Sequence, residues 1–265
     1  MKEVQLVLTD LDSTLLTSDN EVPKQFYELI PQLEDLGVTI AIASGRPLIT
    51  LKNLFPDPKM VLICDNGGLI YYNGKIRFKS LIPVNEYQSM ISLVNRKTKA
   101  VPIVCGLDAG YIPVNFPRVA ERLTSFFKEL RLVDDMSKLN VEADKFTAFS
   151  IDQQSRKTYQ QVMEPALSTK YSVVVGSDEA VDVMNKGINK GSAVKFLGEQ
   201  LKIEPQKMMA FGDAENDASM LKRVKYSYLV SNHAIGMEKW AKYRTSSNDD
   251  LGVIKVLNQL MTEKN

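Results

Sequence analysis

Cysteine, histidine and long apolar runs are scarce in this sequence. Its 265 residues include two cysteines, Cys64 and Cys105, and one histidine, His233. Two separated thiols and a lone imidazole argue against a zinc site, and buried free thiols in a reducing cytoplasm are expected rather than a disulfide. No apolar run approaches the ~20 residues of a membrane-spanning helix, and the N-terminal run meets aspartate too early for a signal peptide. A cytoplasmic protein is expected.

An excess of charge of either sign is also missing. The chain has 33 basic and 32 acidic residues, a net charge of +1, which gives no general attraction to nucleic acid or anionic membrane. Apolar residues make up 44% and charged residues 25%, as in ordinary globular proteins, and the length allows one large domain or two small ones. The expected partner is a small molecule, with no nucleic acid, no membrane and no obligate protein partner.

Short apolar runs alternate with helical patterns at the start of the chain. The expected strands are 6–9, 38–43 and 61–64, and the expected helices are 23–36 and 47–54. This β-α-β-α-β order is typical of a parallel sheet covered by helices. Pro31 falls inside the first helical pattern, where proline can kink or divide a helix.

The pattern changes at about residue 83 and resumes near residue 187. Asn73-Gly74 first predicts a hairpin between two short β-rich runs. Longer irregular links then separate helical patterns, including 116–130 and 155–167, from strand-like runs, including 145–151. We therefore predict an α/β fold: a Rossmann-like parallel-sheet core of residues 1–82 and 187–265, with an α+β domain inserted at 83–186.

Two carboxylates end the first expected strand. In the stretch LVLTDLDSTLL, Asp10 and Asp12 follow a buried apolar run directly. Holding two like charges close together costs free energy unless a cation, a proton or a phosphoryl group compensates them. A lone pair of this kind is more often a polar loop that caps a helix, so the rest of the chain has to decide.

A second acidic cluster, Asp213 and Asp217, follows the apolar run 208–211, with Gly212 at the turn. The carboxyl ends of parallel strands share one edge of a sheet, so Asp10 and Asp12 are expected to meet this cluster there. Four carboxylates in one pocket require a hard divalent cation, and oxygen ligands favour Mg²⁺ over Zn²⁺.

Groups suited to an anion occur at the same edge. Ser44, Gly45 and Arg46 follow the second strand, and Lys190 begins the first helix after the insertion. Each is weak alone, since Ser-Gly-Arg occurs by chance in many loops and a helix-start lysine is usually exposed. Together, a hydroxyl, a lysine and a cation are what a phosphoryl group requires.

Other polar residues near the expected pocket have simpler explanations. Asp65 and Asn66 follow the third strand, where a turn at Asn66-Gly67 is favoured over direct chemistry. Asp182 lies near the return from the insertion, and a solvated position is expected for it. His233 is interpreted as a loop or helix-start residue rather than a catalytic base.

The motifs together resemble those of the haloacid dehalogenase superfamily, in particular its Cof-type phosphatases. The family's D-x-D-x-T-L matches Asp10–Leu15, its Ser-Gly-Arg matches Ser44–Arg46, its motif lysine matches Lys190, and its G-D-x-x-N-D matches Gly212–Asp217. The resemblance implies a Mg²⁺-dependent phosphoric monoester hydrolase acting on a small phosphorylated metabolite, with a sugar phosphate favoured. It also implies that residues 83–186 form a cap domain that sets substrate specificity.

The resemblance further implies a role for each matched residue. Asp10 would attack phosphorus and form an aspartyl-phosphate, while Asp12 would act as general acid and then as general base. Mg²⁺ would be held by Asp10, Asp213 and the backbone carbonyl of Asp12, with Asp217 as a further metal ligand or as a residue that orients the other ligands. The residues implied in substrate binding are Ser44, Gly45, Arg46, Lys190 and Asn216.

One position departs from the family pattern. The family usually has glycine where this chain has Ser13, which could restrict the turn or alter local hydrogen bonds. Two alternatives stay open. A sugar phosphomutase would return the phosphoryl group to a sugar, and a regulatory protein would bind a phosphorylated metabolite without turnover, with Ser13 as its sequence support.

Overall fold

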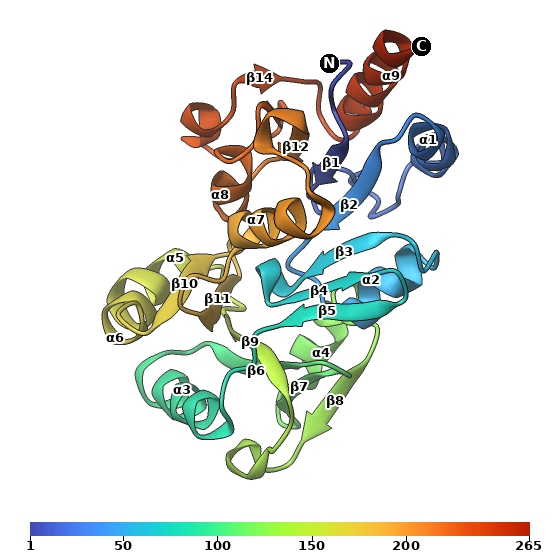
Figure 1. The fold of residues 1–265 in the computed structure, drawn as a ribbon. Helices are drawn as coiled ribbons and strands as arrows, with labels where there is room; N and C mark the ends of the chain where they lie inside the picture. Colours follow the sequence, from blue (N-terminus) through green and yellow to red (C-terminus); the bar gives the residue numbers. More distant parts are fainter. The chain divides into compact units, whose positions relative to one another are not determined.

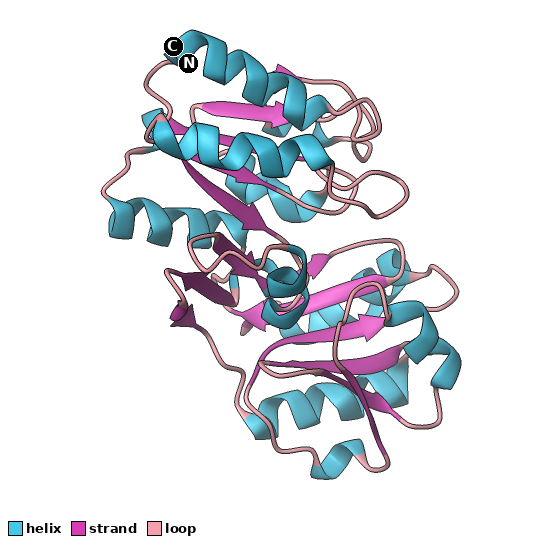
Figure 2. Ribbon diagram, turned by 90° about the vertical axis from the view of Figure 1, so that its right-hand side faces the viewer, coloured by secondary structure: helices cyan, strands magenta, loops and turns pink.

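The computed structural model describes residues 1–265, which divide into two compact units. One unit comprises Met1–Ser44, Pro58–Ile63 and Lys190–Asn265, and the other comprises Gly45–Asp57 and Cys64–Asn189. Parallel strands and covering helices confirm the predicted α/β fold class (Figure 1 and Figure 2). The domain limits at 82/83 and 186/187 stay a prediction.

The first unit is built on a parallel sheet with the strand order β14-β13-β12-β1-β2-β3. Leu6 of β1 pairs with Thr39 of β2 on one side and with Met208 of β12 on the other. The central strands are almost entirely apolar, as expected for strands that helices cover on both faces. The strands are β1 (Leu6–Thr9), β2 (Thr39–Ala43), β3 (Val61–Cys64), β12 (Met208–Gly212), β13 (Tyr226–Leu229) and β14 (Tyr243–Arg244).

Four helices cover this sheet, and they are α1 (Lys24–Asp35), α7 (Lys190–Leu201), α8 (Ala218–Leu221) and α9 (Gly252–Lys264). Helix α1 packs beside α9, and α7 packs beside α8, on opposite sides of the sheet (Figure 1). Pro31 is exposed and does not divide α1, whose apolar stripe of Phe26, Leu29 and Leu33 is buried.

The second unit contains a six-stranded sheet with the order β10-β11-β9-β6-β7-β8. Its neighbouring strands are antiparallel except for β7 and β8. The strands are β6 (Val101–Gly106), β7 (Gly110–Pro113), β8 (Leu130–Val133), β9 (Ala143–Phe149), β10 (Tyr171–Val175) and β11 (Ala180–Asn185). All six lie within the stretch that the sequence predicts as an insertion.

The predicted hairpin is also present in this unit, as β4 (Leu69–Tyr72) and β5 (Lys75–Lys79). Asn73 and Gly74 join the two strands, and both have positive φ angles, of 50° and 71°. Two-residue hairpin turns of this kind favour Asn-Gly because few other residues tolerate that backbone conformation.

Helices pack on both faces of the six-stranded sheet. Tyr87 and Met90 of α3 pack in one cluster with Phe146, whereas Val119 and Leu123 of α4 pack in another with Phe149. The helices of this unit are α2 (Leu48–Leu54), α3 (Val84–Lys97), α4 (Pro117–Leu123), α5 (Ser155–Thr158) and α6 (Glu164–Leu167), with a π-helical turn at Tyr159–Met163 between the last two.

The single helix expected over 116–130 is wrong. Helix α4 ends at Leu123, and Leu130 begins β8, where it pairs with Gly110. The Phe127 ring packs against Gly110, where a Cβ atom would lie only 2.5 Å from the Phe127 ring. The apolar residues that suggest one long helix therefore serve a helix, a loop and a strand.

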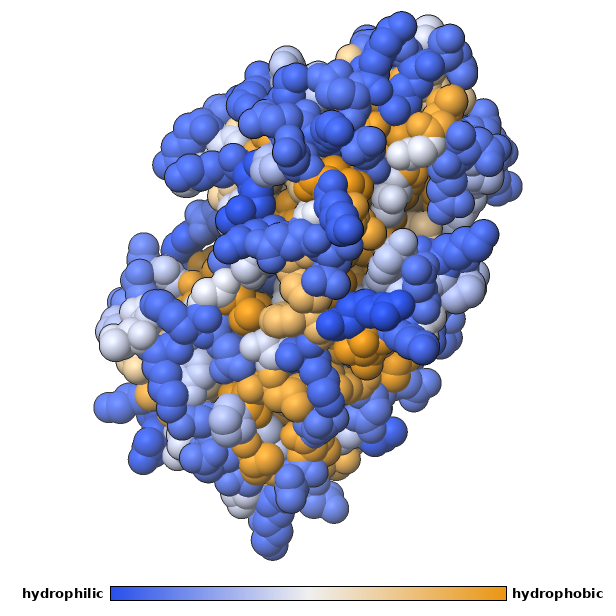
Figure 3. Space-filling model, in the orientation of Figure 1, coloured by the Kyte–Doolittle hydropathy of each residue, from blue (hydrophilic) through white to orange (hydrophobic).

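Neither unit contains a helix long and apolar enough to cross a membrane. Hydrophilic side chains cover much of the face drawn in Figure 3. Both cysteines are buried and free, as expected.

Candidate active site

A buried lysine joins two of the predicted acidic residues in the first unit. Asp10 follows β1, and its Oδ1 accepts a hydrogen bond of 2.5 Å from Nζ of Lys190. The same ammonium donates to Oδ1 of Asp217 at 2.6 Å. Lys190 and Asp217 are both 0% exposed. Lys190 is therefore enclosed between two carboxylates, unlike an ordinary lysine at a helix start.

Two glycines allow this close approach. A Cβ atom on Gly212 would lie 2.6 Å from Cβ of Asp217, so only glycine fits at the end of β12. A Cβ atom on Gly191 would lie 2.5 Å from the carbonyl oxygen of Ser219, where α7 and α8 meet. The two glycines thus bring the start of α7 against the acidic turn.

Asp217 also organises the turn that carries Asp213. Its Oδ2 accepts hydrogen bonds from the backbone N–H groups of Asp213 (3.0 Å) and Ala214 (3.2 Å). Thr14 donates from Oγ1 to Oδ1 of Asp213 at 3.1 Å, which ties the loop after β1 to the turn after β12. Both oxygens of Asp217 are hydrogen-bonded, so it fixes the positions of Lys190 and of this turn.

The carboxylates of Asp10, Asp213 and Asp217 form a compact oxygen cluster. Each offers one oxygen, and these oxygens lie within 4.8 Å of one another. Three carboxylates lie close to one ammonium, which contacts only Asp10 and Asp217, so negative charge is in excess. A hard divalent cation with oxygen ligands would balance it, and the donor set fits Mg²⁺.

The electrostatics of the cluster agree with that excess. Burial raises the pKa of Asp10 well above its usual value, and repulsion from Asp217 adds to the effect, while Lys190 opposes it. Burial and Asp217 likewise raise the pKa of Asp213 to about 6. Burial alone would lower the pKa of Lys190, but Asp10 and Asp217 raise it, so the ammonium stays charged.

The other predicted residues lie at strand ends or in the adjoining turns. Asp12 is in the loop after β1, Ser44 follows β2 and is buried, and Asn216 is in the turn Glu215–Asp217. Gly45 and Arg46 belong to the second unit, where Arg46 donates from Nη1 to the carbonyl of Ser125 at 2.8 Å. The catalytic, metal-binding and substrate-binding roles of all these residues, and of Asp10, Lys190, Asp213 and Asp217, stay predictions.

Sequence reasoning missed two asparagines that support the loop after β1. Asn232 donates from Nδ2 to the carbonyl of Ser13, and Asn248 donates from Nδ2 to the carbonyl of Leu16, both at 2.8 Å. The backbone N–H of Asn248 in turn donates to Oδ1 of Asn232. The sequence does show that both asparagines follow the last two strands. It does not show that they bind the loop after β1, which lies more than two hundred residues away in the chain.

Ser13 has a φ of 58°, in the left-handed region that favours glycine. We expect Ser13→Gly to raise the free energy of unfolding by about 0.5–1 kcal/mol, since a side chain in this region costs more than the extra flexibility of glycine. Chemical denaturation would measure the change. Ser13→Ala is the control because it removes the hydroxyl and keeps Cβ, so no gain is expected. A Ser13→Gly protein that is less stable than the parent would contradict the interpretation that the backbone at Ser13 is strained.

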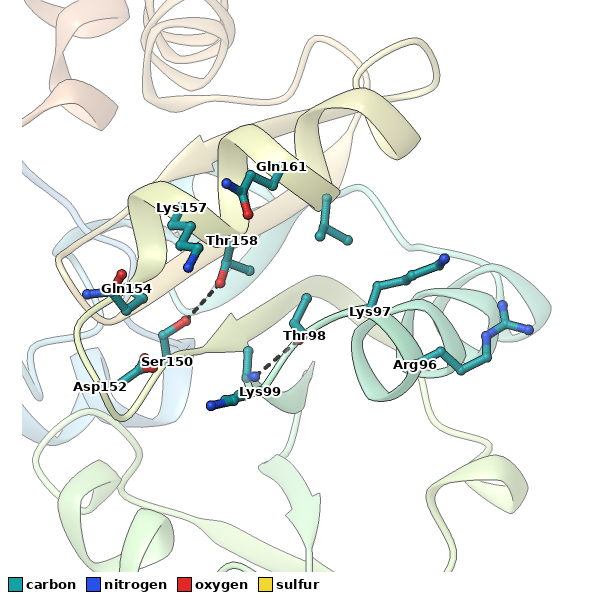
Figure 4. A pocket seen from close by; sticks show the side chains of 12 residues that line it. Arg96, Lys97, Thr98, Lys99, Ser150, Asp152, Gln154, Lys157, Thr158 and Gln161 are labelled. Atoms are coloured by element: carbon teal, nitrogen blue, oxygen red, sulfur yellow. Dashed lines mark hydrogen bonds between the residues drawn. The ribbon is translucent and has the colours of Figure 1, made fainter.

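One cavity in the second unit lies apart from the predicted site residues. It has a volume of about 400 Å³ and is lined by the end of α3, the loop before β6, the turn after β9 and the α5 region, including Lys99, Lys157 and Thr158 (Figure 4). Arg96 and Lys97, at its edge, extend away from Ser150 and Thr158 (Figure 4). None of the predicted catalytic, metal or phosphate-binding residues lines it.

A family model described as haloacid dehalogenase-like hydrolase matches residues 7–257. The chain is 21% identical to the 5-amino-6-(5-phospho-D-ribitylamino)uracil phosphatase YbjI of Escherichia coli, over 97% of this chain and 96% of that protein. It is 25% identical to the phosphatase YcsE of Bacillus subtilis, named for the same substrate, over 96% of this chain and 95% of that one. The crystal structure of SMU.1108c from Streptococcus mutans is similar with a TM-score of 0.90 and 26% identity, over 98% of this chain and 99% of that one.

Proposed function

Because this chain belongs to the haloacid dehalogenase-like hydrolases, we propose that it is a Mg²⁺-dependent phosphatase acting through an aspartyl-phosphate on Asp10. The observation that carries the proposal is the buried contact of Lys190 with both Asp10 and Asp217, beside Asp213. A lysine held there can bind a phosphoryl oxygen while it keeps Asp10 in place. We also propose that the protein is located in the cytoplasm.

In the first step, a carboxylate oxygen of Asp10 attacks phosphorus and the ester P–O bond breaks. Asp12 donates its proton to the departing oxygen, so the alcohol leaves in its neutral form. Ser44, the Gly45 N–H, Arg46, Lys190 and Asn216 hold the phosphoryl oxygens. In the second step, Asp12 accepts a proton from water as the water oxygen attacks phosphorus, and inorganic phosphate leaves Asp10.

The carboxylates of Asp10 and Asp213, with the backbone carbonyl of Asp12, would hold Mg²⁺, and Asp217 would be a further ligand or would orient the others. The bound cation would neutralise charge on the phosphoryl oxygens. Because both oxygens of Asp217 already accept hydrogen bonds, Asp217 contributes mainly by orienting Lys190 and the turn of Asp213.

The proposed substrate is a small sugar or polyol phosphate, with residues 83–186 as the cap domain that selects it. Two relatives are named for a substrate in which a ribityl chain carries the phosphate, and that chain is a polyol. That compound therefore belongs in the first panel of substrates, beside hexose and pentose phosphates, nucleotides and flavin mononucleotide.

The test is phosphate release from that panel, with Mg²⁺ and with EDTA. We expect turnover of at least one sugar or polyol phosphate with Mg²⁺ and none with EDTA, since the acidic cluster lacks its balancing cation there. Release that is unchanged by EDTA would contradict the proposal. Isomerised sugar phosphate without free phosphate would instead indicate a mutase, and binding without either product would indicate a regulator.

A further inference from the structure

A buried polar cluster in the second unit has no part in the chemistry above. Asp182 accepts hydrogen bonds from Thr147 (2.6 Å, at Oδ1) and from Asn66 (2.8 Å, at Oδ2). Lys145 lies beside it, 3.2 Å from Oδ1 of Asp65 and 3.9 Å from Oδ2 of Asp182. Asp182 is only 5% exposed, so the solvated position expected from the sequence is wrong.

The sheet brings these side chains onto one face. Thr147 of β9 pairs with Asp182 of β11, and Lys145 lies two residues before Thr147 on the same side of β9. Lys145 is 4% exposed, and every residue of β9 is buried. Burial lowers the pKa of this lysine, but Asp182, Cys105 and Asp65 raise it, so Lys145 is charged.

Stability alone gives no reason for such an arrangement. A buried ion pair often contributes no more than apolar side chains of the same volume, because both charges lose their hydration. Asp65 and Asn66 also have positive φ angles, of 49° and 56°, although neither is glycine. Aspartate and asparagine adopt this conformation more readily than most residues, so it is the buried charges that call for a functional explanation.

The contact that links this cluster to function is made by Lys145 with Gly45. Nζ of Lys145 donates to the carbonyl oxygen of Gly45. The side-chain amide of Asn66 also packs against Gly45. A Cβ atom on Gly45 would lie 3.4 Å from Oδ1 of Asn66. The next residue is held as well, because the backbone N–H of Asp65 donates to the carbonyl of Arg46 at 3.1 Å.

Glycine needs such support at this place. With no side chain, Gly45 could adopt many backbone conformations, and only some direct its N–H at an anion. The guanidinium of Arg46 is fixed in turn, by the carbonyl of Ser125 and by the Phe126 ring, whose centre is 4.9 Å away. The Gly45 carbonyl, the Arg46 carbonyl and the Arg46 side chain are thus each held by a contact within this unit.

We propose that Lys145 is a positioning residue for phosphate binding: its ammonium, placed beside Asp65 and Asp182, fixes the Gly45 carbonyl and with it the backbone conformation of Gly45, so that the Gly45 N–H is preorganised for a phosphoryl oxygen. The inference rests on the proposed function, in which Gly45 binds that group. Preorganised donors bind a charged group more tightly because no reorganisation accompanies binding.

The test is the affinity for inorganic phosphate, by calorimetry with saturating Mg²⁺, together with KM and kcat for the best ester. For Lys145→Met we expect phosphate Kd and KM to rise at least about tenfold, with a smaller change in kcat. A merely structural role would lower kcat through loss of folded protein and leave KM and Kd unchanged. Lys145→Gln is the second variant, since it removes the charge but keeps a polar side chain that can donate a hydrogen bond.

Lys170→Met is the matched control. Lys170 is an exposed lysine of the same unit that pairs with Glu86, so its loss should leave phosphate Kd and KM unchanged. Folded Lys145 variants that bind phosphate as tightly as the parent would overturn the proposed role of Lys145 but not the proposed phosphatase function. A parent protein that neither binds phosphate nor releases it from any ester would overturn the proposed function instead.

Discussion

Asp10→Asn is expected to lower phosphate release by at least about 10³-fold, because an amide cannot replace the proposed carboxylate nucleophile and form the acyl phosphate. The substitution changes one oxygen to nitrogen and keeps the shape of the side chain. Its remaining oxygen can still accept the hydrogen bond from Lys190. The measurement is the rate of phosphate release from the best ester with saturating Mg²⁺, under conditions where a slow residual rate is detectable.

The same variant should fold at least as stably as the parent in metal-free buffer. Asp10 is buried, and the carboxylates of Asp217, Asp213 and Asp12 all repel its charge. Replacing it with a neutral amide removes that repulsion, while Lys190 keeps Asp217 as its partner. Thermal unfolding with EDTA would show an equal or higher midpoint, so lost activity could not be attributed to unfolding.

Asp19→Asn is the matched control, since Asp19 is an exposed aspartate further along the same loop region. It should change neither the rate nor the midpoint. Intact mass of acid-quenched samples gives a second reading: a phosphoryl adduct on the parent should be missing from Asp10→Asn. A variant that releases phosphate at the parental rate would exclude Asp10 as nucleophile.

Much of the candidate site could be predicted from the sequence because it depends on local rules. An apolar run that ends in carboxylates, as at Leu6–Asp10, marks a buried strand with a polar end. Parallel strands place such ends at one sheet edge, which is why the strand pattern alone brings Asp10 and Asp213 together. The fold adds that Lys190 touches Asp10 and Asp217 directly.

The cluster around Lys145 could not be predicted in the same way. Its partners, Asn66 and Asp182, are 116 residues apart in the chain, and no periodicity connects them. The available signal was Asp144-Lys145 inside the otherwise apolar run of β9, since charged residues are rarely buried without a partner. That signal identifies an unusual strand, but it does not name the partner.

The expected helix at 116–130 failed for a related reason. Val119, Leu123 and Phe127 follow helical spacing, and spacing alone cannot tell whether one helix or several elements bury them. Pairing of Leu130 with Gly110 in β7 decides the outcome, and that pairing depends on the tertiary fold.

Lys190→Met is the second variant with a large expected effect, on both activity and stability. It leaves Asp10 and Asp217 facing each other in a buried site without their shared ammonium. Removing one partner of a buried charge pair costs about 3–5 kcal/mol, so we expect a loss of this size in the free energy of unfolding near neutral pH. Phosphate release should fall below detection in the same protein, because the proposed mechanism also assigns Lys190 to binding of the phosphoryl group.

The stability loss should depend on pH in a defined direction. A carboxyl group whose pKa is higher in the folded protein stabilises the fold at low pH, and that contribution disappears as pH rises through the folded value. Burial and like charge already raise the pKa of Asp213 to about 6 and that of Asp10 well above its usual value. Without Lys190 both rise further, so the deficit relative to the parent should be small near pH 4 and grow towards pH 8.

Lys195→Met is the control, because Lys195 lies in the same helix, is 62% exposed and pairs only distantly with Glu199 at 3.8 Å. Its unfolding free energy should match that of the parent at every pH in metal-free buffer, since an exposed pair contributes little. A Lys190→Met deficit that stays constant from pH 4 to 8 would mean that lost packing, not unpaired carboxylates, causes the instability. Recovery of Lys190→Met by a second change, Asp217→Asn, would separate the two causes, since it removes one of the facing charges and leaves the methionine in place.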